Sequence, residues 1–223
     1  MESRDDGVLM HSAPEVVPLF STPLVTFDVP DAAALNADLR RIIEQREQSH
    51  PSTQKSNQGG WQSSWDMDRW GGVPAIKLLA HARNLANRMT TDQQGLSGKG
   101  PYPDHFAVTW IGNMWANVNR SGDANEFHSH PGAYWSGVYY VDDGGIAADP
   151  SLGGELEFLD PRGPVPLMNA PHLRISGSLS AGATERVTPE AGKMVIFPAW
   201  MMHGVRPYRG NAQRVSIAFN LSV

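Results

Sequence analysis

The sequence predicts a mainly β protein whose N-terminal α-helices pack on one side of a β-sandwich or barrel. Helical periodicity of the apolar residues is confined to the first hundred positions. The rest of the chain consists of short apolar or alternating runs separated by turn residues. The chain has 223 residues, of which 40% are hydrophobic, and this is enough for one core. We therefore expect a single domain over 1–223.

The first part of the chain should contain a loose lead-in over 1–22, followed by a strand and supporting helices over 23–100. Pro23–Val29 has the apolar content of a strand, and Asp31 is placed to cap a helix that runs to about Gln48. A second helix should begin near Pro74 and end before Gly95. The apolar positions of the helices repeat at three and four residues: Leu35, Leu39, Ile42 and Ile43, then Ala75, Leu78, Leu79, Ala82, Leu85, Ala86 and Met89.

A polar, glycine-containing segment, SNQGGWQSSWDMDRWGG, separates the two helices, and we predict a loop here. Its three tryptophans are more typical of anchors onto the core than of contacts to a substrate. A role for Asn57 or Trp61 facing a functional site is the less favoured alternative.

The β core is expected over 101–223. Its strand-like runs are His105–Val118, Tyr134–Val141, Glu155–Leu159, His172–Ile175, Met194–Phe197 and Arg214–Leu221, with turn residues between them.

The composition excludes several classes of function. Because the chain has no cysteine, only His, Asp and Glu are available to bind a metal. The net charge of -5 and the absence of Lys and Arg runs argue against binding to nucleic acid or to a membrane surface. No apolar run reaches membrane length and the N-terminus does not resemble a secretory signal, so we expect a cytoplasmic protein. The oligomeric state is not determined, and a homodimer stays open.

His128 and His130 are the first candidates for a metal site. Alternate residues of an extended segment share a face, so both imidazoles can point to the same side. A zinc, iron or copper ion needs at least one more ligand, and His203 near the C-terminus is the candidate. Glu126 is a lower-ranked alternative. The other histidines are assigned to the surface or the core: His11, His50, His81, His105 and His172.

The last predicted strand carries a candidate anion site. Arg214 and Ser216 share one of its faces with Ala218 and Asn220, while the other face is apolar and should pack on the core. A guanidinium group inside a barrel needs an anion, and its planar fork fits a carboxylate, to which a serine hydroxyl can also donate. The anion could belong to the protein or to a ligand.

Two further residues are candidates for ligand binding. Asn117 lies in an earlier strand, on the same face as Trp115 and Asn119, from which its amide could donate to a bound ligand. Tyr139 and Tyr140 must point to opposite faces, so at most one of them lines a pocket.

Several segments, in order along the chain, resemble the iron- and 2-oxoglutarate-dependent oxygenase superfamily, specifically a bacterial and phage branch with HxHP, SGVYY and FPxWxxH motifs. They are SNQGGWQS, HSHPGAYWSGVYYV, GGELEFLDPR, GKMVIFPAWMMHGV and RVSIAFN. The resemblance covers most of the chain from Pro23 onward. It implies a double-stranded β-helix, a cupin-like jelly roll with helices packed on one sheet. It also implies a dioxygenase, with hydroxylation as the reaction, that uses Fe(II), 2-oxoglutarate as cosubstrate and dioxygen on an unknown primary substrate.

The resemblance assigns roles residue by residue. His128 matches the first metal-binding histidine and His203 the distal one, while Arg214 and Ser216 match the pair that binds the far carboxylate of 2-oxoglutarate. We add Asn117 and Tyr140 as candidates for binding this cosubstrate.

His130 departs from the pattern, because most of the superfamily has Asp or Glu at this position. Three imidazoles leave room for a 2-oxo acid and dioxygen, but they would equally suit a tetrahedral zinc ion with one water. Two alternatives follow: a cupin-like metalloenzyme that does not use 2-oxoglutarate and has no need of Arg214, and a noncatalytic module that binds or senses a carboxylate.

Overall fold

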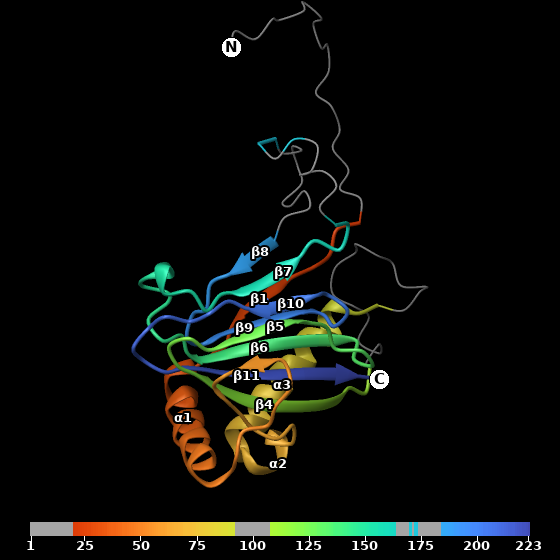
Figure 1. The fold of residues 1–223 in the computed structure, drawn as a ribbon. Helices are drawn as coiled ribbons and strands as arrows, with labels where there is room; N and C mark the ends of the chain where they lie inside the picture. The colour runs from red at the N-terminus through yellow and green to blue at the C-terminus, as the bar shows by residue number, and fades with distance from the viewer. Residues whose placement is uncertain (1–19, 92–107, 164–169, 171, 174–183) are drawn as a thin grey trace, which may run out of the picture.

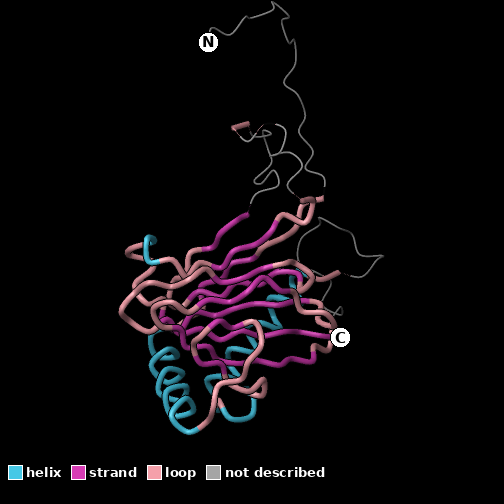
Figure 2. The backbone as a smooth tube through the Cα atoms, viewed as in Figure 1, coloured by secondary structure: helices cyan, strands magenta, loops and turns pink. Residues whose placement is uncertain are grey.

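A computed structural model describes residues 20–91, 108–163, 170, 172–173 and 184–223. In this part of the chain two antiparallel β-sheets are stacked, and the helices lie on one side of the stack (Figures 1 and 2). The prediction of a mainly β protein with N-terminal helices on one sheet is confirmed. None of the helices in the described part is long and apolar enough to cross a membrane.

The larger sheet has six strands in the order β1-β9-β6-β11-β4-β3. Their bounds are β1 (Val25–Asp28), β9 (Lys193–Pro198), β6 (Trp135–Asp142), β11 (Arg214–Ser222), β4 (Ile111–Asn119) and β3 (Trp61–Gln62). The smaller sheet has five strands in the order β2-β5-β10-β7-β8. These are β2 (Asn57–Gln58), β5 (Ala124–His128), β10 (His203–Val205), β7 (Leu156–Leu159) and β8 (Thr184–Val187).

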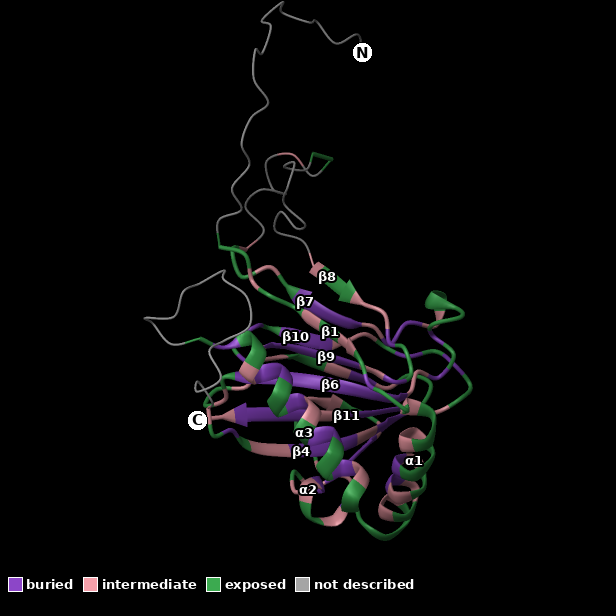
Figure 3. Ribbon diagram, turned by 180° about the vertical axis from the view of Figure 1, so that it is seen from behind, coloured by how far each residue is buried: buried purple, intermediate pink, exposed green. Residues whose placement is uncertain are grey.

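The helices are α1 (Ala32–Ser49), α2 (Met67–Trp70) and α3 (Gly72–Met89), with a short 3-10 helix, η1 (Pro150–Leu152), in a loop. The three α-helices cover the face of the larger sheet that points away from the smaller one (Figure 3). Leu39 of α1 and Leu78 of α3 belong to the same buried cluster as Ile217 and Phe219 of β11. The apolar face of β11 therefore packs toward the helices, and the face that carries Arg214 is left for the space between the sheets.

Asp31 was expected to cap α1, and this detail is wrong. It occupies the N-cap position, but its φ is 54 and its side chain makes no capping hydrogen bond. A capping side chain normally projects from an extended backbone, so the left-handed conformation of Asp31 prevents it from capping. The predicted strand His172–Ile175 and the start of the run at His105 lie largely outside the described residues.

The segment expected to be a loop between the helices instead contains α2 and two short strands, β2 and β3, which belong to different sheets and are linked by a two-residue turn. This turn and its two strands are called the hairpin below. β2 pairs with β5 in the smaller sheet, and β3 pairs with β4 in the larger one. The turn between them consists of Gly59 and Gly60, whose φ values are 72 and 65. Such angles strain any residue with a Cβ, which explains the glycine pair.

Gly59→Ala is expected to lower the free energy of unfolding by about 1–3 kcal/mol, because the residue has a strained φ and its new Cβ would lie 2.2 Å from Asp123 Oδ1. The other oxygen of Asp123 accepts a hydrogen bond from the Arg120 amide at 2.6 Å, which holds the carboxylate in place. Urea denaturation measures the loss. Gly122→Ala is the matched control, since its φ is 97 but no atom lies within 4 Å of an added Cβ. Equal losses in the two variants would contradict the steric explanation.

Candidate active site

A cavity of about 480 Å³ lies between the sheets. Its walls come from β4, β6, β9 and β11 of the larger sheet, from β5, β7 and β10 of the smaller one, and from the segment that contains the hairpin. This volume is in the usual range for a small-molecule site, and the walls combine aromatic rings with a few charged and amide side chains.

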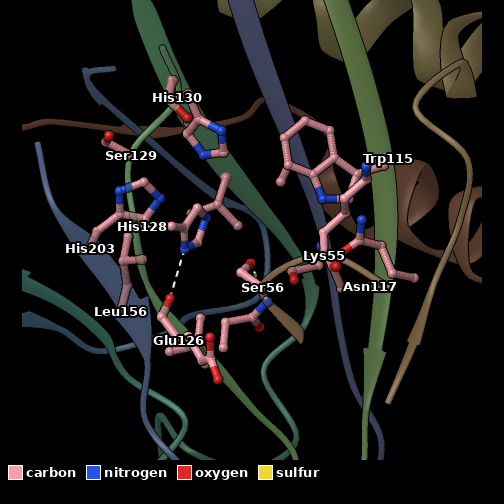
Figure 4. A pocket seen from close by; sticks show the side chains of 18 of the residues that line it. Lys55, Ser56, Trp115, Asn117, Glu126, His128, Ser129, His130, Leu156 and His203 are labelled. Carbon is pink, nitrogen blue, oxygen red and sulfur yellow. Dashed lines mark hydrogen bonds between the residues drawn. The ribbon is translucent and has the colours of Figure 1, made fainter. Parts of the chain in front are cut away.

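The three predicted metal ligands meet in this cavity (Figure 4). One candidate ligand atom from each of His128, His130 and His203 lies within 4.8 Å of the other two. His128 ends β5 and is the direct cross-strand partner of His203 in β10. The turn after His128 brings His130 back to them, and the His130 amide donates to Ala199 O at 2.9 Å.

Main-chain carbonyls orient two of these imidazoles. His128 Nδ1 lies 2.7 Å from Glu126 O, and His203 Nδ1 lies 2.8 Å from Met201 O. Because a carbonyl oxygen only accepts hydrogen bonds, Nδ1 carries the proton in both rings and Nε2 keeps a free lone pair. This is the tautomer that a histidine needs to bind a metal through Nε2.

Burial keeps the three imidazoles neutral. Burial, together with a smaller effect of the nearby His128, lowers the pKa of His203 to about 3 and that of His130 to about 4. Burial also lowers the pKa of His128. Neutral imidazole nitrogens are good ligands for divalent iron, copper or zinc, so the residues present fit such an ion.

The metal-free protein is expected to lose stability as the pH falls from 6.5 toward 5. In the unfolded chain histidine titrates near 6.5, whereas the folded pKa values of His130 and His203 are about 4 and 3. The unfolded state therefore binds more protons in this window, and stability falls with pH by up to about 1.4 kcal/mol per pH unit for each histidine. Urea denaturation in the presence of a chelator at several pH values measures this slope. His203→Gln, which cannot be protonated, should show a shallower slope, and identical slopes would contradict the explanation.

Arg214 is a buried, positively charged residue that also lines the cavity. It is only 1% exposed, and its Nη1 donates to Asn119 Oδ1 at 3.0 Å and to Ser216 Oγ at 3.3 Å. Within the described part of the chain, no ion pair joins Arg214 to a carboxylate. Arg214 Nε and Tyr140 Oη are both buried without a hydrogen-bond partner. Of the two anions that the sequence left open, this arrangement favours a ligand.

The remaining candidates divide between the pocket and the far side of the sheet. Asn117 and Tyr140 line the cavity. Tyr139 points to the opposite face, where its hydroxyl donates to Asn36 of α1 at 2.6 Å. Glu126 lines the cavity but does not join the three histidines, and its carboxylate accepts a hydrogen bond from Gln58 at 3.0 Å.

The individual residues of one cavity wall were not predicted. Lys55, Ser56, Gln62 and Trp65 line it, whereas Asn57 and Trp61, the residues that had been considered, do not. Instead, the Trp61 indole donates to His50 O at 2.9 Å and the ring is part of the core behind the larger sheet.

A series of ring contacts connects this wall to the histidines. Trp65 stacks on Trp115 with a centroid distance of 5.1 Å, and the Trp115 ring is 5.8 Å from that of His130. The run of tryptophans was visible in the sequence, but nothing in it indicated which of them faced the cavity.

Residues 113–220 match the protein-family model described as "Putative 2OG-Fe(II) oxygenase". All seven site residues predicted from the sequence lie in this range: Asn117, His128, His130, Tyr140, His203, Arg214 and Ser216. No curated protein matches the chain by sequence.

Solved structures share the fold. A prolyl-4-hydroxylase from Pseudomonas putida is 19% identical with a TM-score of 0.60, and the match covers 91% of this chain and 93% of that one. A prolyl hydroxylase from Trichoplax adhaerens, in complex with a hypoxia inducible factor peptide fragment, is 16% identical with a TM-score of 0.60 and coverages of 89% and 83%. HygX from Streptomyces hygroscopicus, with nickel and 2-oxoglutarate bound, is 12% identical with a TM-score of 0.55 and coverages of 90% and 83%. The predicted double-stranded β-helix is thereby confirmed.

Proposed function

We propose, on the premise that residues 113–220 belong to the Fe(II)- and 2-oxoglutarate-dependent oxygenases, that this enzyme hydroxylates a substrate bound in the cavity between its sheets. The family requires Fe(II) and 2-oxoglutarate, and dioxygen is the second cosubstrate.

Fe(II) would be held by His128, His130 and His203. Three observations support this assignment. One nitrogen from each ring lies within 4.8 Å of the others, and the three rings are neutral. In His128 and His203, a main-chain carbonyl also fixes the proton on Nδ1. Bound Fe(II) and 2-oxoglutarate together supply the activation of dioxygen, with succinate and carbon dioxide as the products of the cosubstrate. The protein's own contribution is to leave one side of the three-histidine group open to the cavity.

The far carboxylate of 2-oxoglutarate would bind to Arg214. The observation that carries the proposal is that this guanidinium is buried in the cavity without a carboxylate partner among the described residues. A buried cation with no counter-ion is costly, so binding of an anion there is strongly favoured. The hydroxyls of Ser216 and Tyr140 and the Asn117 amide are further donors on the same wall.

The substrate would occupy the side of the cavity formed by the hairpin segment. Lys55, Trp65 and Trp115 line this side. They belong neither to the proposed metal ligands nor to the residues proposed to bind the carboxylate of 2-oxoglutarate.

Anaerobic titration of the Fe(II)-loaded protein with 2-oxoglutarate tests the proposal, followed by measurement of succinate after oxygen is admitted. We expect binding of one 2-oxoglutarate per iron and slow succinate formation even before a substrate is known. Protein that binds iron but neither binds 2-oxoglutarate nor forms succinate would contradict the proposal. Stoichiometric zinc that iron cannot replace would instead favour a cupin-like metalloprotein that does not use 2-oxoglutarate.

A further inference from the structure

His130 differs from the other two histidines in what faces its Nδ1 atom. The Nδ1 atoms of His128 and His203 face main-chain carbonyls, but that of His130 lies 3.4 Å from the side-chain amide nitrogen of Asn220. An amide nitrogen donates, so in this orientation Nδ1 of His130 would accept and the ring proton would sit on Nε2. A ring in that tautomer could not bind a metal through Nε2.

Two buried side-chain oxygen atoms, one in the residue that contacts His130 and one in its cross-strand partner, have no hydrogen-bond donor. They are the side-chain oxygens of Asn220 and of Asn113. The two asparagines are direct cross-strand partners in β11 and β4, and such partners have Cβ atoms about 4.5–5.5 Å apart on the same face of a sheet. Buried amide oxygens normally find a donor, so this pair needs an explanation.

Rotation of the Asn220 amide by half a turn resolves both problems. It places Oδ1 toward His130 Nδ1 and moves Nδ2 to the position where Oδ1 lacked a donor. The Asn220 oxygen then accepts from the His130 ring, and its amide nitrogen can donate to Asn113 Oδ1. All three histidines then carry their proton on Nδ1 and present Nε2.

We propose that Asn220 is the positioning residue of His130: it accepts the Nδ1 proton, fixes the ring tautomer that binds metal through Nε2, and is itself oriented by Asn113. Asn220 is only 5% exposed, so water has little access to replace it as an acceptor. This inference rests on the metal site of the proposed function, but it does not depend on the binding of 2-oxoglutarate.

Proton NMR of the Co(II)-substituted protein tests the inference without any measurement of activity. The ring N–H protons of imidazoles bound to Co(II) are strongly shifted, and they disappear in D2O when solvent can reach them. The wild-type protein should show three such signals. Asn220→Leu, which has a similar size but no acceptor, should retain two of them, and its Kd for Co(II) should rise about 10- to 100-fold.

Two variants separate the hydrogen bond from packing. Asn220→Asp keeps an acceptor, so it should restore the third signal and a Kd equal to or lower than that of the wild type. Asn87→Leu removes an amide that accepts from the Trp110 indole at 2.8 Å on the helix side of the larger sheet, so it should change neither the signals nor the Kd.

Three signals and an unchanged Kd in Asn220→Leu would overturn the inference. Equal losses of signal and affinity in Asn220→Leu and Asn220→Asp would also overturn it, because they would indicate packing. Failure of the wild-type protein to bind Co(II) would instead overturn the metal site of the proposed function.

Discussion

Replacement of Arg214 by methionine should weaken the binding of 2-oxoglutarate to the Fe(II)-loaded enzyme by about 10²- to 10³-fold and leave iron binding unchanged. The loss of a buried, charge-assisted pair typically costs about 2–5 kcal/mol, and here the ligand's carboxylate would remain in the cavity without its cation. Anaerobic calorimetric titration with 2-oxoglutarate measures the effect. In the absence of the ligand, the variant should be at least as stable as the wild type, since the guanidinium is buried without a carboxylate in the described part of the chain.

Two milder variants of the same strand serve as controls. Arg214→Lys keeps the charge but loses the planar fork, so its affinity should lie between those of the wild type and the methionine variant. Ser216→Ala removes one hydroxyl, and a single hydrogen bond of this kind contributes about 0.5–1.5 kcal/mol, so the loss should be roughly tenfold or less. An unchanged affinity in Arg214→Met would mean that 2-oxoglutarate binds elsewhere or is not a ligand.

His130→Ala should lower the affinity for Fe(II) by more than about 100-fold, whereas His130→Asp should retain the metal. Loss of a ligand should exceed the 10- to 100-fold effect typical of residues that only support ligands. Aspartate can instead complete the two-histidine, one-carboxylate arrangement that suits Fe(II). Metal content after dialysis and Fe(II) titration under anaerobic conditions measure both variants.

The control for this pair is His81→Ala. His81 lies on α3, outside the cavity, and its ring contacts Phe27, so its loss should leave metal affinity unchanged. Full retention of iron by His130→Ala would show that His130 is not a ligand and would direct attention to Glu126, the carboxylate nearest to it in the sequence that also lines the cavity.

The sequence was most informative where side chains alternate along strands of useful length. Arg214 and Ser216 could be placed opposite an apolar face because β11 has nine residues, which is enough for the alternation to be clear. The same alternation separated Tyr139 from Tyr140. The predicted proximity of His128 and His130 is also found, but β5 ends at His128 and the segment that follows brings His130 to it.

The parts that could not be predicted depend on contacts between distant segments. β2 and β3 have two residues each, so no periodic pattern can reveal them. The contribution of Lys55 and Trp65 to the cavity follows from the pairing of this hairpin with β4 and β5, far along the chain. The proximity of Asn220 to His130 likewise requires the tertiary structure, because ninety residues separate them.

The β2–β3 hairpin also shields parts of two strand edges. The outermost strand of a sheet exposes unpaired N–H and C=O groups, to which a strand from another molecule can add. Without the hairpin, β4 and β5 would be the outermost strands on this side of their sheets, and the hairpin pairs with two residues of each. A deletion here would therefore expose unpaired backbone groups of β4 and β5 at the same time. New substrate preferences should arise by exchange of side chains such as Lys55 and Trp65, while changes in the length of this segment should yield insoluble protein.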